Sequence, residues 1–363
     1  MHLSGGRLRE FAQGCDVLGG GGGGPAGDSL PLALHAVDLN GPVEVVDLAE
    51  LPEDGLVMPC AFLGAPAIGA ERIGTCRESV AIRRHVEHHF GKPVVAMLCT
   101  EIGGYNGPAA AALASHAGLP LLDGDGMGRA FPGVDQVAMQ LAGVTPGPSV
   151  LADEHDRVVT VHAEDGAWLE RLARTVVTGF GDRGVSSEYV MTAQQARADG
   201  AVVLGSVRKA LRIGELLAQP GSVVRRVRAL AGEFDGRVVA EGRISAVLPA
   251  TGPDAEVLAT NRRTPAMLEG IGPDRGRTLR LEVGHEYLAV IEDGEPLATM
   301  PDIITLFDTY TGQPVSAERL RYGLRVVVLA LPCPPLWRTE DGLALVGPGA
   351  FGLDLPYRPL EVS

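Results

Sequence analysis

PVVAMLCTEIGGYNGPAAAALASHAGLPLLDGDGMGRAFP, residues 93–132, predicts a strand, a helix and a second strand, with a polar turn after each strand. The stretches at 93–99 and 119–123 are short, rich in Val and Leu and bounded by Gly or Pro, which is typical of strands buried on both faces. The alanine-rich stretch at 109–118 predicts the helix between them. Two strands joined through a helix normally lie parallel in one sheet.

The flanking sequence extends this pattern into an α/β domain over residues 1–165. We expect three layers there, with helices on both faces of a mostly parallel sheet, and a hairpin at 148–163 that closes the domain. The further strands and helices are predicted at 43–48, 55–64, 71–90 and 134–143.

Residues 166–363 show a different pattern, which predicts a second domain. WLERLARTVV (168–177) and SVRKALRIGELL (206–217) predict helices, and the sequence after residue 222 is strand-like. The turn EDGE at 292–295 lies between alternating apolar residues, which indicates a hairpin. We therefore expect a helical connector followed by a small β-barrel or sandwich.

The glycine run LGGGGGGP, residues 18–25, needs a structural reason, because glycine loses more backbone entropy on folding than any other residue. A helix capped by Ser4 precedes it, and Asp28 is predicted to cap the helix that follows. Such a loop places free N–H groups of Gly21, Gly22 and Gly23 at a helix start, where an anionic or carbonyl group binds. The run lacks the Lys-Ser/Thr of a Walker A motif and a leading strand, so we expect no nucleotide.

Composition narrows the class of protein. The net charge is −14 and no Lys/Arg-rich block occurs, which argues against nucleic-acid and anionic-membrane partners. The five cysteines are scattered without a CxxC pair, so neither a disulfide framework nor a cysteine zinc site is expected. The chain has no apolar run long enough to cross a bilayer, and its start has no apolar h-region. We expect a cytoplasmic protein.

Polar residues gather in the turns that follow the strands, at 64–66, 100–106 and 123–132. The carboxyl ends of parallel strands share one edge of a sheet, where ligands bind, so these turns should lie side by side. Convergent carboxylates there can ligate a hard cation or share a proton, and a guanidinium can clamp a carboxylate. Asp-Gly pairs are also ordinary turn formers, and an Asp there can simply cap a helix. The candidate catalytic residues are Glu101, Asp123, Asp125 and Arg129, with Asn106 as a candidate for positioning a carbonyl or a water.

The histidines and cysteines carry less information. His85 and His89 are spaced i, i+4 on a predicted helix, but no third ligand is suggested and the pair lies toward a solvated face. Cys99 precedes the polar turn without a recognisable base, so it is interpreted as a buried core residue. The sequence leaves a divalent metal open.

Four segments together resemble the S-methyl thiohydantoin desulfurase-like family, which is associated with hydantoinase and oxoprolinase genes. The resemblance extends from about residue 7 to residue 358. It implies an N-terminal three-layer α/β domain, a C-terminal domain with a β-barrel portion, and hydrolytic removal of sulfur from a thiohydantoin ring. The segments are LGGGGGGP, VEVVDLAELPEDGLVMPCAFLGAP, EIGGYNGPAAAALASHAGLPLLDGDGMGRAFP and PCPPLWRTEDGLALVGPGAFG.

Within these segments, the residues Glu101, Asn106, Asp123, Asp125 and Arg129 match the signature positions of the family. Gly103 and Gly104 of the EIGG segment, and Trp337 and Arg338 of the LWR segment, are further candidates for substrate binding.

Two departures from the family pattern affect the substrate. The glycine run is longer than usual and has Gly24 where an Asp normally follows, and residues 179–203 match only loosely. We therefore expect a small-molecule substrate that is an S-methyl thiohydantoin or a hydantoin-like ring. Two alternatives remain: a non-catalytic binding subunit that works beside a hydantoinase-type enzyme, and a ring-forming biosynthetic enzyme. A homo-oligomer is also left open.

Overall fold

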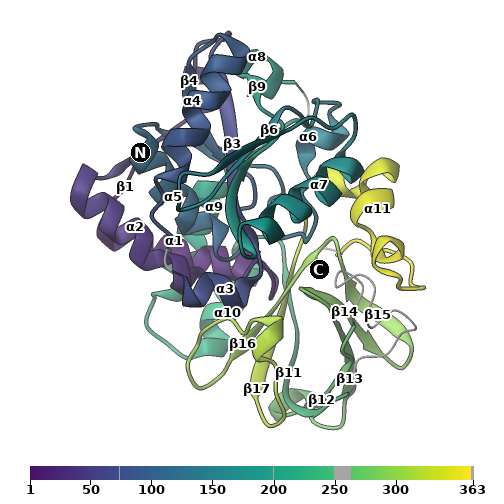
Figure 1. The fold of residues 1–363 in the computed structure, drawn as a ribbon. Coiled ribbons are helices and arrows are strands. Elements are labelled where there is room, and N and C mark those ends of the chain that lie inside the picture. The colour runs from purple at the N-terminus through teal and green to yellow at the C-terminus, as the bar shows by residue number, and fades with distance from the viewer. Residues whose placement is uncertain (73, 199, 249–262, 361–363) are drawn as a thin grey trace.

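The first sheet is built around four parallel strands, β2 (Val43–Val46), β3 (Leu56–Gly64), β4 (Val94–Cys99) and β5 (Leu121–Asp125). The computed structural model describes residues 1–363 except 73, 199, 249–262 and 361–363 (Figure 1). The strand order is β1-β2-β5-β4-β3-β8-β6-β7, with β9 on β3 and β10 on β5. The antiparallel additions are β1 (His2–Leu3), β6 (Ser149–Ala152), β7 (Val158–Val161), β8 (Arg183–Ser187), β9 (Met191–Thr192) and β10 (Val203–Leu204).

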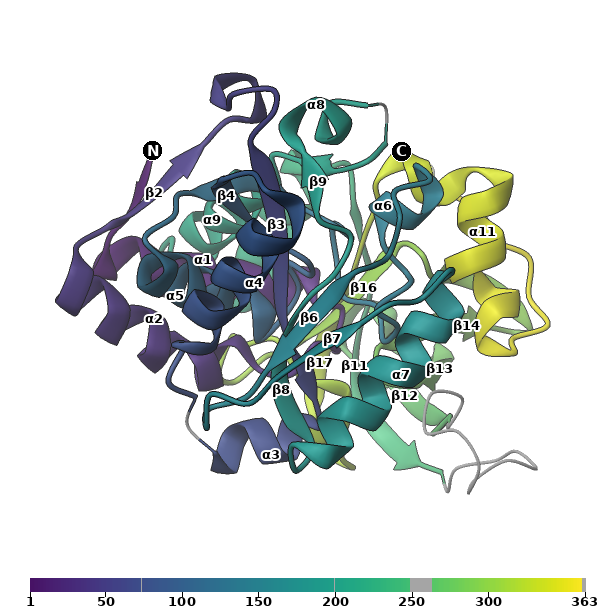
Figure 2. The same cartoon turned by 45° about the horizontal axis from the view of Figure 1, so that its top comes forward.

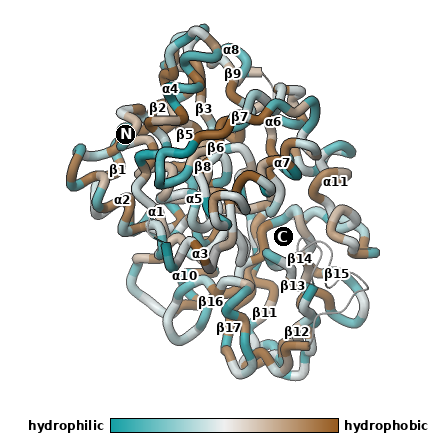
Figure 3. The backbone as a smooth tube through the Cα atoms, viewed as in Figure 1, coloured by the Kyte–Doolittle hydropathy of each residue, from teal (hydrophilic) through white to brown (hydrophobic). Residues whose placement is uncertain are grey.

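Both faces of this sheet are covered, which explains why its strands are apolar without alternation. Along β4, Met97 and Cys99 belong to one apolar core, whereas Ala96 and Leu98 belong to the other. The first face is covered by α1 (Gly5–Leu18), α2 (Ala26–Asn40), α4 (Glu78–Phe90), α5 (Asn106–Ala117) and α9 (Ser206–Leu217), and the second by α6 (Ala138–Leu141), α7 (Gly166–Gly179), α8 (Ala193–Ala196) and α11 (Glu340–Val346). Figure 2 shows the helices of the first face and α7 of the second on opposite sides of the sheet. Figure 3 shows the hydrophobic colour along strands such as β6.

Helices α1 and α9 pack unusually closely, although they are far apart in sequence. A Cβ added at Gly14 would lie 1.7 Å from the carbonyl oxygen of Ala210, and one added at Gly214 would lie 1.8 Å from that of Glu10. Glycine at these two positions therefore lets the backbones touch, and the contact fixes the end of α1 from which the glycine run begins.

The second sheet is antiparallel and curls into a half-barrel, in the strand order β15-β14-β13-β12-β11-β17-β16 (Figure 1). The predicted hairpin at the EDGE turn is confirmed, because Glu292 pairs with Glu295. The strands are β11 (Arg237–Val247), β12 (Ala266–Gly270), β13 (Thr278–Val283), β14 (Tyr287–Glu292), β15 (Glu295–Thr299), β16 (Ile303–Asp308) and β17 (Arg325–Leu331). The α/β class, the mostly parallel first sheet and the barrel-like second part are thus confirmed.

Two local predictions were wrong. Helix α2 begins at Ala26 rather than at a cap on Asp28, because the Asp16 carboxylate accepts the Ala26 N–H at 2.7 Å. Residues Val223–Glu233 form helix α10, although the sequence after 222 was predicted to be strand-like. The first sheet also takes β8, β9 and β10 from beyond residue 165, so the sheet crosses the division that the sequence suggested. RVVAEGRISAVLP (237–249) is one of the strand-like stretches after residue 222, and its last residue lies outside the described residues.

Candidate active site

The turns after the parallel strands meet at one edge of the first sheet. The Ile102 N–H donates to Asp125 Oδ2 at 3.0 Å, and the Gly126 N–H donates to the Thr100 carbonyl at 3.0 Å. Asn106, the first residue of α5, accepts the Phe62 N–H of β3 at 2.8 Å. The turns that follow β4 and β5 therefore touch each other directly, and β3 joins them through Asn106.

The glycine run packs against both of these turns and against the second sheet. The Tyr105 N–H donates to the carbonyls of Gly23 and Gly24, each at 3.0 Å, and the Tyr287 N–H donates to the Gly20 carbonyl at 2.9 Å. A Cβ at Gly22 would lie 2.4 Å from Glu286 Oε1. The run is thus a packing surface between the two sheets, and its carbonyl groups make the contacts. Of the three N–H groups predicted to bind a ligand, that of Gly22 donates to the Gly19 carbonyl at 3.0 Å, whereas those of Gly21 and Gly23 donate no hydrogen bond among the described residues.

Two further glycines make room for the run. A Cβ at Gly103 would lie 2.8 Å from the Cα of Gly19, and a Cβ at Gly104 would lie 2.3 Å from the Gly24 carbonyl oxygen. The EIGG turn and the glycine run therefore touch backbone to backbone. A side chain at position 103 or 104 would collide with the glycine run, which explains why both residues are glycines.

Glu101 is buried at this junction beside Asn106. The Asn106 amide donates to Glu101 Oε2 at 2.7 Å. Burial raises the pKa of Glu101 to about 8, and the hydrogen bond from Asn106 opposes that rise. The charges of Glu286 and Asp125 also contribute to the raised pKa, so these carboxyl groups are electrostatic neighbours. A carboxyl group with this pKa keeps its proton at neutral pH and can donate it.

Arg129 and Glu286 are the two opposite charges at the glycine run. Arg129 is fully buried and donates to the carbonyls of Pro301 and Asp302 at 2.7 and 2.9 Å, but its Nη2 has no partner among the described residues. Glu286 lies in the turn between β13 and β14; burial raises its pKa to about 7, and its Oε2 also has no partner there. In the described part of the chain, no ion pair within 4.0 Å joins the two. Buried polar atoms are normally paired with protein groups or with water, so these two unpartnered atoms make Arg129 and Glu286 the candidates for contact with a ligand at the glycine run.

Asp125 accepts hydrogen bonds from both of the turns that carry Glu101 and Arg129. Its Oδ2 accepts three backbone N–H groups, from Ile102, Met127 and Gly128, at 3.0, 3.0 and 2.8 Å. Burial raises its pKa to about 6 in spite of these bonds. The carboxylate therefore fixes the relative positions of the two turns that carry Glu101 and Arg129.

The structure places Asp123 in a different environment from Asp125. It lies within β5, and its carboxylate accepts the Arg208 backbone N–H at the start of α9 and forms an ion pair with the Arg208 guanidinium. Arg208 also pairs with Asp47, which follows β2. Asp123 is therefore held in an ion-pair network, and the structure does not bring it to the glycine run.

Trp337 and Arg338 hold the turn that carries Arg129. The indole N–H of Trp337 donates to the Met127 carbonyl at 2.7 Å, and its ring packs edge-on against Phe131 at 5.1 Å. Arg338 lies 3.3 Å from the carboxylate of Asp302, the residue whose carbonyl accepts from Arg129. Both side chains thus contact the supports of Arg129.

The structure confirms that Cys99 is a buried residue of the core. Cys99 is fully buried, and burial raises the pKa of its thiol well above the usual range. In the described ranges, no group of three or more His, Cys, Asp or Glu side chains is arranged to hold a metal ion.

Sequence reasoning missed Glu286 and Tyr287 of the second sheet. A glutamate in a short turn between strands carries no local signal of burial. Only the contact with the glycine run reveals it.

Comparisons with known proteins agree with the architecture. Residues 6–163 match the N-terminal domain of S-Me-THD-like proteins, and residues 164–360 match their C-terminal domain. The chain therefore belongs to the S-Me-THD-like family. A crystal structure of a protein from Chromobacterium violaceum superposes with a TM-score of 0.80 at 24% identity, covering 99% of this chain and 100% of that one. No curated protein matches. None of the helices in the described ranges has both the length and the apolar character that crossing a membrane requires.

Proposed function

We propose that this protein is a hydrolase that acts on a small cyclic amide or thioamide, namely an S-methyl thiohydantoin or a hydantoin-like ring. Membership of the S-Me-THD-like family supports the substrate class. The observation that carries the proposal is the pair Arg129 and Glu286: two buried, opposite charges beside one glycine run, each with an unpartnered atom. A small polar ring can bridge such a pair, whereas a purely structural pair would form an ion pair directly.

The reaction requires water to add to ring carbon C2 and methanethiol to leave. Glu286, with a pKa of about 7, takes one proton from the water as its oxygen bonds to C2, and returns that proton to the ring nitrogen. Glu101 gives its proton to sulfur as the C2–S bond breaks, and regains one from the adduct hydroxyl as the new carbonyl forms. Nη2 of Arg129 stabilises the negative charge that develops on the ring during the addition.

The experiment measures methanethiol release from an S-methyl thiohydantoin by Glu101→Gln and Glu286→Gln variants. Each variant should lose roughly 100-fold or more in turnover, because it removes a proton-transferring group. Glu188→Gln is the matched control: Glu188 is equally buried with a pKa raised to about 7, but its charged neighbours are Glu170 and Arg174 of α7. We expect this control to keep full activity.

Two results would overturn the proposal. If both variants turned over at the wild-type rate, the chemistry would lie elsewhere. If the wild-type protein bound the ring without releasing methanethiol, the alternative of a non-catalytic binding subunit would replace the hydrolase.

A further inference from the structure

The turn that holds Arg129 is itself anchored by the carboxylate of Asp302. Asp302 lies between β15 and β16, and its side chain is fully buried. Its Oδ1 accepts the Cys333 N–H at 2.9 Å and the Tyr357 hydroxyl at 3.2 Å. Its Oδ2 accepts the Leu360 N–H at 3.2 Å. These donors lie 31 to 58 residues away from Asp302 in the chain, so the C-terminal part of the chain sets the position of the turn.

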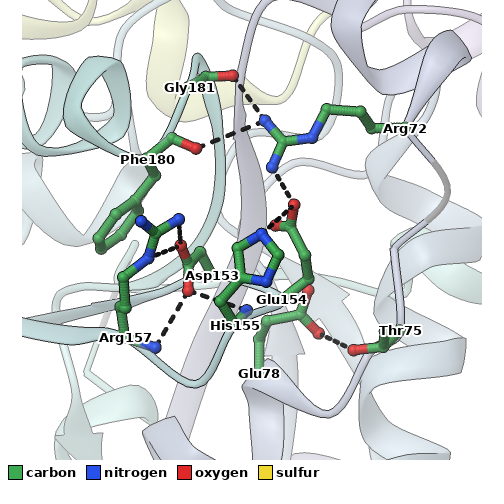
Figure 4. A network of polar contacts seen from close by, with 9 residues as sticks. All are labelled: Arg72, Thr75, Glu78, Asp153, Glu154, His155, Arg157, Phe180 and Gly181. Atoms are coloured by element: carbon green, nitrogen blue, oxygen red, sulfur yellow. Dashed lines mark hydrogen bonds and ion pairs between the residues drawn. The ribbon is translucent and has the colours of Figure 1, made fainter.

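The buried Asp153, in the turn between β6 and β7, is satisfied in a different way (Figure 4). It accepts the backbone N–H groups of His155 and Arg157, each at 3.0 Å, and pairs with the Arg157 guanidinium. All of these donors belong to its own turn, so the bonds hold a local conformation. Asp302 differs because its side-chain bonds join the turn that supports Arg129 to distant segments.

The C-terminal strap, residues 353–360, carries two of these donors. It forms neither helix nor strand, but both of its ends are buried. Leu353 packs in the core that α7 and α11 share, and Leu360 packs in the core of the second sheet. Between them, burial raises the pKa of the Tyr357 phenol, so this hydroxyl keeps its proton and donates to Asp302. The strap therefore bridges two cores and ends on the Asp302 carboxylate.

The same turn fixes the direction of Arg129. Its Nη1 donates to the carbonyls of Pro301 and Asp302, and its Nε donates to the Ala130 carbonyl at 2.9 Å. Because a guanidinium is planar, these bonds also decide where the unpartnered Nη2 points. Burial lowers the pKa of Arg129, and the charge of Asp302 is one of those that oppose this fall. A displacement of the turn would thus move Nη2 and weaken the support of its charge.

We infer that Tyr357 is a positioning residue of the proposed active site, which holds Nη2 of Arg129 toward the ligand by fixing Asp302. The inference rests on the proposed function and adds the C-terminal strap to that site. A buried network of charged and polar groups adds little net stability, but it keeps its members in one arrangement. The network at Asp302 therefore suits a role in orienting Arg129.

The test is a double-mutant cycle on the affinity for hydantoin, measured by isothermal titration calorimetry. Tyr357→Phe keeps the ring and its packing but removes the hydroxyl. It should weaken hydantoin binding roughly fivefold, because Arg129 loses its fixed direction. Arg129→Lys keeps a positive charge but has no planar fork to direct. In that background Tyr357→Phe should change the affinity by less than about twofold, since Tyr357 acts only through Arg129.

Tyr189→Phe is the matched control. The Tyr189 ring is fully buried, and its hydroxyl donates to the Gln140 side chain of α6 at 2.8 Å. The change therefore removes a comparable hydroxyl bond at a place that does not hold Arg129. Hydantoin should bind to this control as it does to the wild type.

Three results would overturn the inference. They are an unchanged affinity in Tyr357→Phe alone, an equal loss in both backgrounds, and no binding of hydantoin by the wild type. The second would mean that the strap only stabilises the fold. Failure of the proposed function gives a different result. If hydantoin binding depended on Tyr357 through Arg129 while the wild type released no methanethiol, the positioning role would stand and the hydrolase would fall. If methanethiol release required Glu101 and Glu286 while Tyr357→Phe bound hydantoin normally, the hydrolase would stand and the positioning role would fall.

Discussion

Two groups of charges at the same edge of the first sheet are organised in opposite ways. Around the glycine run, Arg129 is fully buried, and Glu286 interacts with it electrostatically, but no carboxylate of the described residues lies within ion-pair distance of it. At the β2 and β5 end, the Arg208 side chain is 45% exposed and pairs with both Asp47 and Asp123. Burying a charge without a partner costs stability, whereas an ion pair at the surface contributes little to it. The unpaired atoms of the first group therefore fit the proposed ligand site, whereas in the second group the buried Asp123 carboxylate already has its partner within the fold.

The largest effect should come from the two aspartates of β5, which belong to different groups although they are two residues apart. Asp125→Ala leaves three buried N–H groups without an acceptor and should lower the free energy of unfolding by about 3 kcal/mol or more. Asp123→Ala removes a buried carboxylate that pairs with the half-exposed Arg208 and accepts one backbone N–H. Because Arg208 keeps Asp47 as a partner, the change should cost about 1 kcal/mol. Urea denaturation measures the free energy of unfolding of both variants. Equal losses would show that the two aspartates stabilise the fold to the same extent.

The steric fit of the glycine run gives the next effect. Gly22→Ala places a Cβ 2.4 Å from Glu286 Oε1, so the carboxylate must move. We expect a loss of about 1–3 kcal/mol in stability and roughly tenfold or more in turnover. Gly27→Ala is the matched control, because a Cβ there meets nothing within 4 Å. If Gly22→Ala retained full activity, the run would act as a linker only.

The pH dependence of stability should have opposite signs in the two groups. Glu101 and Glu286 keep their protons to about pH 8 and 7 in the folded chain, but ionise near their ordinary value of 4.5 when unfolded. Between these values the folded chain binds more protons, so the free energy of unfolding falls as pH rises, by up to about 1.4 kcal/mol per pH unit for each group. The exposed Asp47 has a lowered pKa beside Arg208, so its contribution is lost only as pH falls below its ordinary value of 3.8.

Denaturation of the wild type and of Glu101→Gln at pH 5, 6 and 7 measures this effect. The variant should show a shallower fall in stability, because glutamine has no proton to hold. An identical slope would show that Glu101 is ionised in the folded chain.

The smallest effect is expected from Asp47→Asn. Its ion pair with Arg208 is exposed, and Arg208 keeps Asp123 as a partner. Thermal melting and methanethiol release should both match the wild type. A large change in either would mean that the ion pair of Asp47 with Arg208 contributes to stability or to activity.

The sequence was sufficient to predict the parts of the site that depend on local pattern. Apolar runs bounded by Gly and Pro predicted β3, β4 and β5, and the shared edge of parallel strands predicted that Glu101, Asn106 and Arg129 would gather. The position of Asp123 could not be predicted, because Arg208 of the distant helix α9 holds its carboxylate. Helix α10 was not predicted because its valines also suit a strand. It packs against β11 and β17, and this packing stabilises the helix although the local sequence pattern does not show it.

Glu286 was the most important omission. Its turn connects two strands of the second sheet, where glutamate is ordinarily solvated, and nothing local distinguishes it. It becomes buried only because the second sheet packs on the glycine run, which is a contact between segments far apart in the chain. Burial, an unpartnered oxygen and the contact with the glycine run together mark Glu286 as a candidate, whereas Glu188 shares only the first two properties.

The most direct test of the central claim is a crystal structure of the wild-type protein with hydantoin, the product of the proposed reaction. We predict that polar atoms of the ring lie within hydrogen-bonding distance of both Arg129 Nη2 and Glu286 Oε2, with Glu101 beside C2. A hydantoin bound away from the glycine run, with Arg129 and Glu286 joined only to each other or to water, would contradict it.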